Sequence, residues 1–100
     1  MQIEYKTNKL EKECQDLSIA KRAYGEDIAR KLHDRVDQLR AAISIDWLIE
    51  HKFGRCHELK GKRKGEYAMD LAHPYRLVFR EAEGSLIIIL EVVDYHDHGK

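Results

Sequence analysis

The chain of 100 residues has one proline and two cysteines, no net charge, and no apolar run of the roughly 18 residues that span a bilayer. We therefore expect no membrane-spanning segment. The N-terminus has no basic region followed by an apolar stretch, so we also expect no signal peptide and a cytoplasmic location. The two cysteines form no C-x-x-C pair, which excludes a disulfide-rich scaffold and predicts two free thiols in a reducing compartment.

Charged residues are abundant although their sum is zero, since they make up 36% of the chain. A neutral chain is not typical of a free-standing nucleic-acid binder. The distribution is uneven: residues 51–80 hold eight cations and three anions, and residues 81–100 hold one cation and five anions. Such a basic segment marks either a face that contacts phosphate or a solvated loop, and composition alone favours the loop.

Hydrophobic periodicity predicts a single domain over residues 1–100. Gly25 lies inside the helical half as a kink, a helix end or a costly helical residue. The strand over residues 86–95 is almost wholly aliphatic, as in strands buried on both faces. The helical half is expected to begin after a strand over residues 2–6, with N-caps at Thr7 and Asn8 and a first helix that holds Leu10, Cys14 and Leu17. A second helix has the apolar stripe Ile28, Leu32, Val36, Leu39 and Ile43, and a helical turn follows over residues 46–50. The remaining expected elements are strands over residues 57–60, 66–71, 75–80 and 86–95.

The order of elements, β-α-α-β-β-β, predicts an α+β fold in which a helical hairpin covers one face of a sheet that ends in antiparallel strands. The other face would be partly open, and so polar or functional. If Leu77 and Phe79 face the helices, strand alternation turns Arg76 to the open face. The last strand ends in Asp94-Tyr95-His96, where a rigid strand end can position polar groups.

The imidazole, ammonium, guanidinium, phenol and carboxylate side chains of this half of the chain together suit RNA cleavage without a metal. The 2′-hydroxyl must lose a proton and attack the adjacent phosphorus, the leaving 5′-oxygen must gain a proton, and the phosphorane needs cations nearby. The expected roles are proton transfer by His57 and His96, phosphate binding by Lys60 and Arg76, base stacking or hydrogen bonding by Tyr95, and orientation of a neighbour by Asp94.

Each candidate also has a structural interpretation. Isolated histidines such as His51 and His73 are usually surface residues, and Tyr67 and Tyr75 are more typical of a core. A nucleophilic pair of Cys56 and His57 is disfavoured, because adjacent strand residues point to opposite faces. The tail His96-Asp97-His98 has no partner cluster at metal-ligand spacing, so we expect neither metal nor cofactor. Residue chemistry alone therefore predicts a nucleic-acid-binding α+β domain and no more.

Three segments carry a resemblance to a known family. Residues 59–68, residues 74–79 and residues 91–96 resemble the RelE/ParE toxin superfamily of toxin–antitoxin systems. The closing Asp-Tyr-His, together with His57 three residues before Lys60, is similar to the HigB branch. The resemblance implies catalytic or RNA-contacting roles for His57, Lys60, Arg76, Asp94, Tyr95 and His96. The cations expected to contact RNA or the ribosome are Lys62, Arg63, Lys64 and Arg80.

The resemblance implies a ribosome-dependent endonuclease that cleaves messenger RNA in the ribosomal A site without a metal. It also implies a HigA-type helix-turn-helix antitoxin as partner, with DNA contacted only through that antitoxin. The neutral net charge departs from the basic character of many such toxins, so ribosome binding depends on the local basic segment. Two alternatives stay open from the sequence: a ParE-like inhibitor of DNA gyrase, and an inactive module that binds only the antitoxin.

Overall fold

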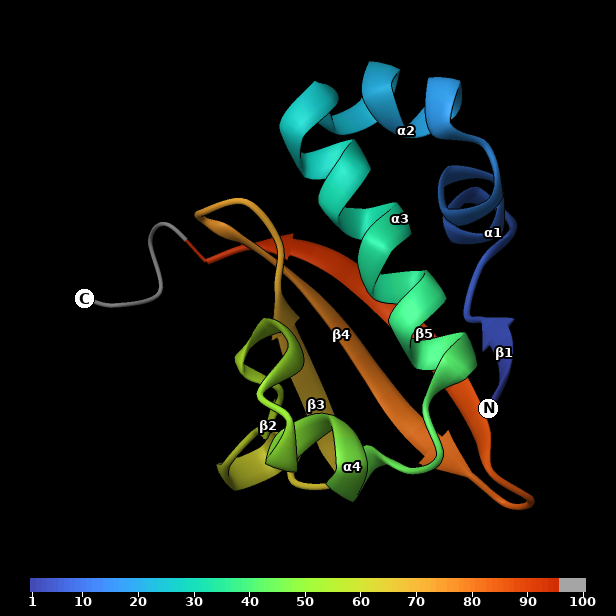
Figure 1. Cartoon of the computed structure of the whole chain (residues 1–100). Coiled ribbons are helices and arrows are strands. Elements are labelled where there is room, and N and C mark those ends of the chain that lie inside the picture. The colour runs from blue at the N-terminus through green and yellow to red at the C-terminus, as the bar shows by residue number, and fades with distance from the viewer. Residues whose placement is uncertain (96–100) are drawn as a thin grey trace.

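The computed structural model describes residues 1–95, which form a five-stranded sheet with helices against it (Figure 1). The strands lie in the order β1-β5-β4-β3-β2, with β1 parallel to β5 and all other neighbours antiparallel. The predicted α+β class is confirmed. The elements are β1 (Gln2–Tyr5), α1 (Asn8–Gln15), α2 (Leu17–Tyr24), α3 (Glu26–Ala41), α4 (Ile45–Glu50), the 3₁₀ turns η1 (Phe53–Arg55) and η2 (Gly61–Arg63), β2 (His57–Glu58), β3 (Glu66–Asp70), β4 (Tyr75–Ala82) and β5 (Leu86–Asp94).

The helical half has more breaks than the predicted hairpin, because two residues interrupt it locally. Thr7 caps α1 as expected, its Oγ1 accepting from the backbone N–H of Leu10 at 3.1 Å. Asp16 ends α1 and caps α2, since one carboxylate oxygen accepts from the amides of Ser18 and Ile19. Gly25, at φ 85°, separates α2 from α3 in a backbone conformation that favours glycine, so it is a helix end.

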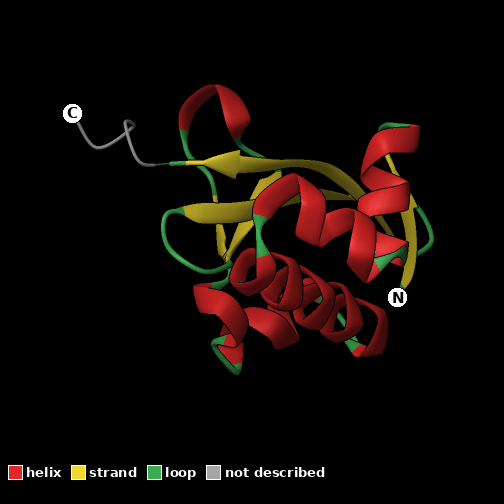
Figure 2. Cartoon of the chain, turned by 90° about the horizontal axis from the view of Figure 1, so that it is seen from above, coloured by secondary structure: helices red, strands yellow, loops and turns green. Residues whose placement is uncertain are grey.

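One face of the sheet carries the core. Figure 1 shows α3 crossing in front of the strands, and Figure 2 shows the sheet with α3 and its neighbours from above. The α3 side chains Leu32, Val36 and Leu39 are buried together with Leu77 and Phe79 of β4, as the predicted alternation requires. Cys14 is also buried in this core, as expected, whereas Ile43 of the predicted stripe is 77% exposed because α3 ends before it.

The opposite side of the sheet bears most of the charged side chains of β3 and β4, and we call it the open face. Cross-strand partners share a face, so Asp70 lies beside Arg76, and Glu66 lies beside Arg80. The predicted orientation of Arg76 toward the uncovered side is therefore confirmed. Within residues 1–95, no helix is both long and apolar enough to traverse a lipid bilayer.

A β-bulge in β5 divides this strand into two halves. Val78 pairs with Glu91 and Phe79 pairs with Ile89, which leaves Leu90 as an extra residue. Ile87 and Ile89 are fully buried against the helices, but beyond the bulge Val92 packs on that core and Glu91 turns to the open face. The prediction of burial on both faces is wrong for this strand, because the helices cover only one side.

The strand predicted over residues 57–60 extends only from His57 to Glu58, at the edge of the sheet. Glu58 pairs with Tyr67, and the amide of Leu59 still donates to the carbonyl of Glu66 at 2.8 Å. Lys60 already lies outside the ladder, next to η2. The positive φ of Gly61 (69°) turns the chain there, so pairing ends where the glycine-bounded basic segment begins.

Candidate active site

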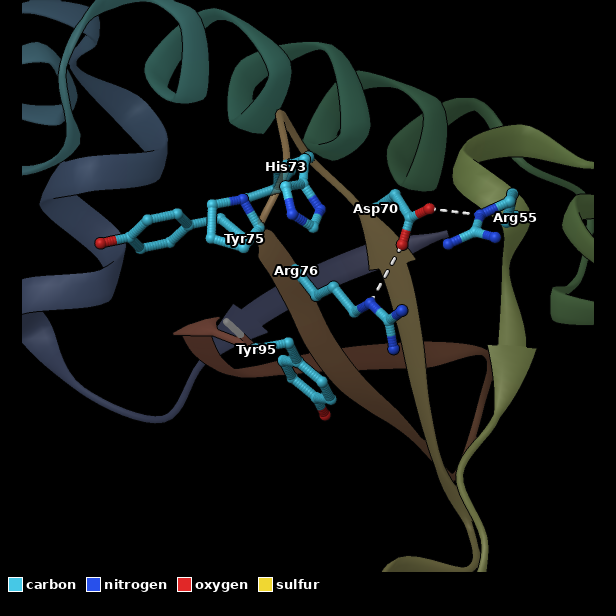
Figure 3. A pocket seen from close by; sticks show the side chains of 8 residues that line it. Arg55, Asp70, His73, Tyr75, Arg76 and Tyr95 are labelled. Atoms are coloured by element: carbon cyan, nitrogen blue, oxygen red, sulfur yellow. Dashed lines mark hydrogen bonds and ion pairs between the residues drawn. The ribbon is translucent and has the colours of Figure 1, made fainter. Parts of the chain in front are cut away.

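A pocket of about 120 Å³ opens where the β3–β4 connection meets the end of β5. Figure 3 shows its side chains, which come from η1, from β3 and β4 with the turn between them, and from the residue after β5. Two guanidinium groups, one carboxylate, one imidazole and the phenol of Tyr95 therefore meet at one place, whereas the ring of Tyr75 points away from Arg76. The lining residues are Arg55, Asp70, Leu71, His73, Pro74, Tyr75, Arg76 and Tyr95.

Arg76 is held at the centre of this pocket by two groups of different kinds. Its Nε lies 3.1 Å from Oδ1 of Asp70, the cross-strand partner on β3. Its guanidinium carbon lies 4.6 Å from the centroid of the Tyr95 ring, a distance at which a cation is attracted to the face of an aromatic. Only 26% of the Arg76 side chain is exposed, so its position is well defined by these contacts.

The connection between β3 and β4 is fixed by backbone hydrogen bonds. The amide of Leu71 donates to the carbonyl of Tyr75 at 2.9 Å, and the amide of Tyr75 donates to the carbonyl of Ala72 at 2.9 Å. The peptide bond between His73 and Pro74 is cis. The amide of Tyr95 donates to the carbonyl of Pro74 at 3.0 Å, which ties the end of β5 to this turn. The turn and the strand end thus form one rigid rim around Arg76.

Arg55 forms the other side of the pocket. Its Nε donates to Oδ2 of Asp70, so one carboxylate joins two arginines. This ion pair raises the pKa of the Arg55 guanidinium above its ordinary value. The carbonyl of Arg55 accepts from Nδ1 of His57 at 2.8 Å, which leaves Nε2 of that imidazole for another partner. His57 is therefore connected to the pocket through Arg55 without lining it.

A second charged cluster lies farther along the open face. Arg63 contacts Glu66 of β3 and Glu91 of β5, with its Nη2 at 2.6 Å from each carboxylate. The hydrogen bond to Glu91 helps to raise the pKa of the Arg63 guanidinium. The two carboxylates belong to the strands on either side of β4, and Val78, the β4 partner of Glu91, is fully buried although it faces away from the helices. Arg63 is thus engaged within the protein.

The structure brings together only some of the residues predicted for the site. Arg76 and Tyr95 meet in the pocket, whereas Asp94 pairs with Tyr75 on the other side of the strand. Lys60 is exposed beyond the edge strand and does not line the pocket, and His96 lies outside the described residues. The remaining predicted RNA-contacting cations, Lys62, Lys64 and Arg80, are exposed.

Three residues that line the pocket were not among the site residues predicted from the sequence. The sequence predicts His73 to be a surface residue, and it is exposed, yet it also lines the pocket. Asp70 and Arg55 had only been counted among the charges of residues 51–80. A signal for Asp70 existed, since a two-strand hairpin with a short connection pairs it with Arg76. No comparable signal existed for Arg55, which reaches Asp70 from an irregular segment.

The two cysteines are unsuited to nucleophilic chemistry. Both are free and buried, and burial raises the pKa of the Cys56 thiol to about 11. Burial also raises the pKa of Cys14, to about 12. Their thiols are therefore protonated at neutral pH, which agrees with the prediction that Cys56 and His57 form no nucleophilic pair. Within residues 1–95, no three histidine, cysteine, aspartate or glutamate side chains gather as metal ligands would.

Comparison with solved structures assigns the architecture. This chain has the fold of YoeB toxins. It superimposes on a chain of the YoeB–YefM complex from Staphylococcus aureus with a TM-score of 0.64 at 19% identity, covering 96% of this chain and 97% of that one. The YoeB dimer from the same organism gives 0.63 at 18% identity over the same shares of the two chains.

The YoeB/ParE toxin from Agrobacterium tumefaciens gives a TM-score of 0.64 at 14% identity, covering 96% of this chain and all of that one. No family model matches the sequence, and no curated protein sequence matches it. The YoeB-like fold therefore rests on the shape of the chain, from β1 to the end of β5.

Proposed function

We propose that this protein is the toxin of a toxin–antitoxin pair and acts in the cytoplasm as a ribosome-dependent endonuclease on messenger RNA in the A site. The observation that carries the proposal is Arg76, which lies over the Tyr95 ring in a pocket that His73 also lines, in a YoeB-like fold. Guanidinium, phenol and imidazole groups around one pocket suit phosphodiester cleavage within an RNA strand.

In the proposed reaction, the 2′-oxygen of the substrate attacks the adjacent phosphorus and loses its proton to a general base. The bond from phosphorus to the 5′-oxygen breaks, and that oxygen receives a proton. The products are a 2′,3′-cyclic phosphate and a 5′-hydroxyl. Arg76 neutralises the charge that develops on the phosphorane, and Tyr95 holds Arg76 in place and offers a surface for a base.

The proton carriers are imidazoles. His73 lines the pocket, and we propose it beside the predicted His57 and His96. His57, Lys60 and the closing Asp94-Tyr95-His96 also support the proposal that the chain belongs to the HigB branch. The exposed cations Lys62, Lys64 and Arg80 supply the proposed ribosome contact, in which they bind phosphate, whereas Arg63 is held by Glu66 and Glu91.

An antitoxin is the proposed protein partner. The S. aureus YoeB was solved in complex with YefM, and the resemblance of the sequence to HigB implies a HigA-type helix-turn-helix protein that would bring DNA contacts to the complex. A helix-turn-helix protein encoded beside this gene, and co-purification of the two chains, would support the pair. Failure of the neighbouring protein to bind would argue against this partner.

The activity is tested with translating ribosomes and a defined message. We expect codon-specific cuts whose fragments end in a 2′,3′-cyclic phosphate and begin with a 5′-hydroxyl. Arg76→Ala should slow cutting by about 100-fold or more, as when a transition-state donor is removed. The matched control is Arg30→Ala, which removes an arginine from an exposed ion pair on α3 at 3.0 Å from Glu26 and should leave cutting unchanged.

Other outcomes decide against the proposal. An intact message together with accumulated gyrase–DNA cleavage complexes would favour the ParE-like activity. If neither message cleavage nor gyrase–DNA cleavage complexes are detected and the antitoxin still binds, the result would favour the inactive binding module. Equal cutting by Arg76→Ala and the unsubstituted protein would remove Arg76 from the mechanism.

A further inference from the structure

Asp70 and its two arginines form a unit that the cleavage mechanism alone does not require. One carboxylate contacts Nε of Arg55 through Oδ2 and Nε of Arg76 through Oδ1. Figure 3 shows the two guanidiniums on either side of the carboxylate. A guanidinium has five N–H donors, and each contact with Asp70 uses the donor on Nε, so both groups keep donors in the Nη positions suited to a second oxyanion.

The three side chains differ in how firmly they are held. Asp70 and Arg76 are 25% and 26% exposed, whereas Arg55 is 73% exposed. Arg76 is fixed by the Tyr95 ring, so Arg55 is the partner that can move when another anion enters. Two cations and one anion also leave the cluster with one excess positive charge, which favours a second anion.

The backbone at Arg55 is in an unusual conformation. Arg55 has φ 51° and Lys52 has φ 59°, both in the left-handed region that residues with a side chain seldom adopt. Such a conformation is energetically unfavourable for a residue with a side chain, and residues held in it concentrate at functional sites. The segment between α4 and β2 therefore holds Arg55 against β3 at an energetic cost, which suits a functional arginine.

We propose that Arg55 and Arg76 together bind one phosphate group of the RNA strand, and that Asp70 is the internal counterion that both guanidiniums hold until that phosphate enters. The proposal rests on the proposed RNA substrate and adds a second phosphate-binding arginine and a competing carboxylate to it. Because carboxylate and phosphate are both anions, Asp70 opposes binding at the same pocket that its arginines create. The resting pocket is thus partly neutralised by its own chain.

The test measures binding without cleavage. A 2′-O-methyl oligoribonucleotide lacks the attacking hydroxyl, and its affinity is followed by fluorescence anisotropy over a series of salt concentrations. Arg55→Ala should weaken binding by about 3- to 10-fold, the loss of one exposed phosphate contact, and should lower the slope of log affinity against log salt by about 0.7. Asp70→Asn keeps the shape of the side chain and should tighten binding by about 3- to 10-fold.

The ion pair of Glu26 and Arg30 provides matched controls. Arg30→Ala and Glu26→Gln make the same changes in a pair on α3, away from the open face, and should alter neither affinity nor slope. Thermal unfolding of every variant identifies a change that acts through folding. Because the Arg55 side chain is exposed, Arg55→Ala should still fold. Its affinity and salt slope therefore test the proposal even if Asp70→Asn does not fold.

Each result separates this proposal from the proposed function. An unchanged salt slope in Arg55→Ala, or no binding of the oligonucleotide by the unsubstituted protein, would overturn the two-arginine site. Weaker binding in Asp70→Asn would show that Asp70 orients the arginines and does not compete with phosphate. Binding that follows the expected pattern in a protein that never cuts RNA would overturn the endonuclease and leave the phosphate site intact.

Discussion

Arg63 lies in the basic turn predicted to contact RNA, but its contacts with Glu66 and Glu91 predict that replacing it lowers the stability of the fold. Arg63→Ala removes contacts at 2.6 Å with Glu66 and Glu91, side chains that are 27% and 39% exposed. Partly exposed pairs of this kind contribute about 0.2–1 kcal/mol each. The change also leaves two carboxylates on one face without their cation, so we expect a total loss of about 1–2 kcal/mol.

For a domain of this size, that loss lowers the melting temperature by roughly 4–15 °C. Urea unfolding followed by circular dichroism measures the free energy, and Lys62→Ala is the control, because Lys62 is an exposed neighbour in the same turn. Glu91→Gln in the Arg63→Ala background should recover part of the loss by removing one unpaired carboxylate. Equal stability of Arg63→Ala and Lys62→Ala, with weaker RNA binding only in the former, would refute the reasoning.

Three further predictions concern the core and the bulge. Deleting Leu90 should close the bulge and leave the rest of β5 on its present faces, because Glu91 would then follow Ile89 directly and still pair with Val78; a deletion variant that no longer folds would contradict this. Tyr24→Phe should lower the free energy of unfolding, measured in urea, by about 1–3 kcal/mol, because the Tyr24 hydroxyl donates to the buried Glu13 carboxylate at 2.6 Å. A change near zero would argue against that hydrogen bond. Burial raises the pKa of the Cys56 thiol to about 11, so its contribution to the free energy of unfolding should be complete below pH 9 and be lost as the pH rises toward 11. Cys56→Ala should make this decline shallower. Identical pH profiles of the two proteins would contradict the prediction.

The part of the fold that follows local rules could be predicted from the sequence. The stripe from Leu32 to Leu39 identified the core side of α3, and alternation in β4 identified Arg76 as facing away from it. These patterns have periods of 3.6 and 2 residues, which one segment displays by itself. The parallel pairing of β1 with β5 joins the two ends of the chain, and no pattern within either strand specifies it.

The candidate site was predicted in part for the same reason. Arg76 and Tyr95 stood out because each lies on a strand or directly after one. Asp70 and His73 belong to the same hairpin as Arg76, but their role appears only when the register of that hairpin is known. Arg55 reaches the pocket from a turn with left-handed backbone, for which the sequence offers no periodic signal.

The extra residue in β5 affects how this chain must be aligned with its structural neighbours. In the first half of the strand, odd-numbered residues such as Ile87 and Ile89 face the helices, and beyond Leu90 an even-numbered residue, Val92, does so. An ungapped alignment with a strand that has no bulge would place Tyr95 opposite a core position. Comparing site residues with a strand of that kind therefore requires a one-residue gap at Leu90, and apparent loss of the tyrosine in such a relative should first be checked against that shift.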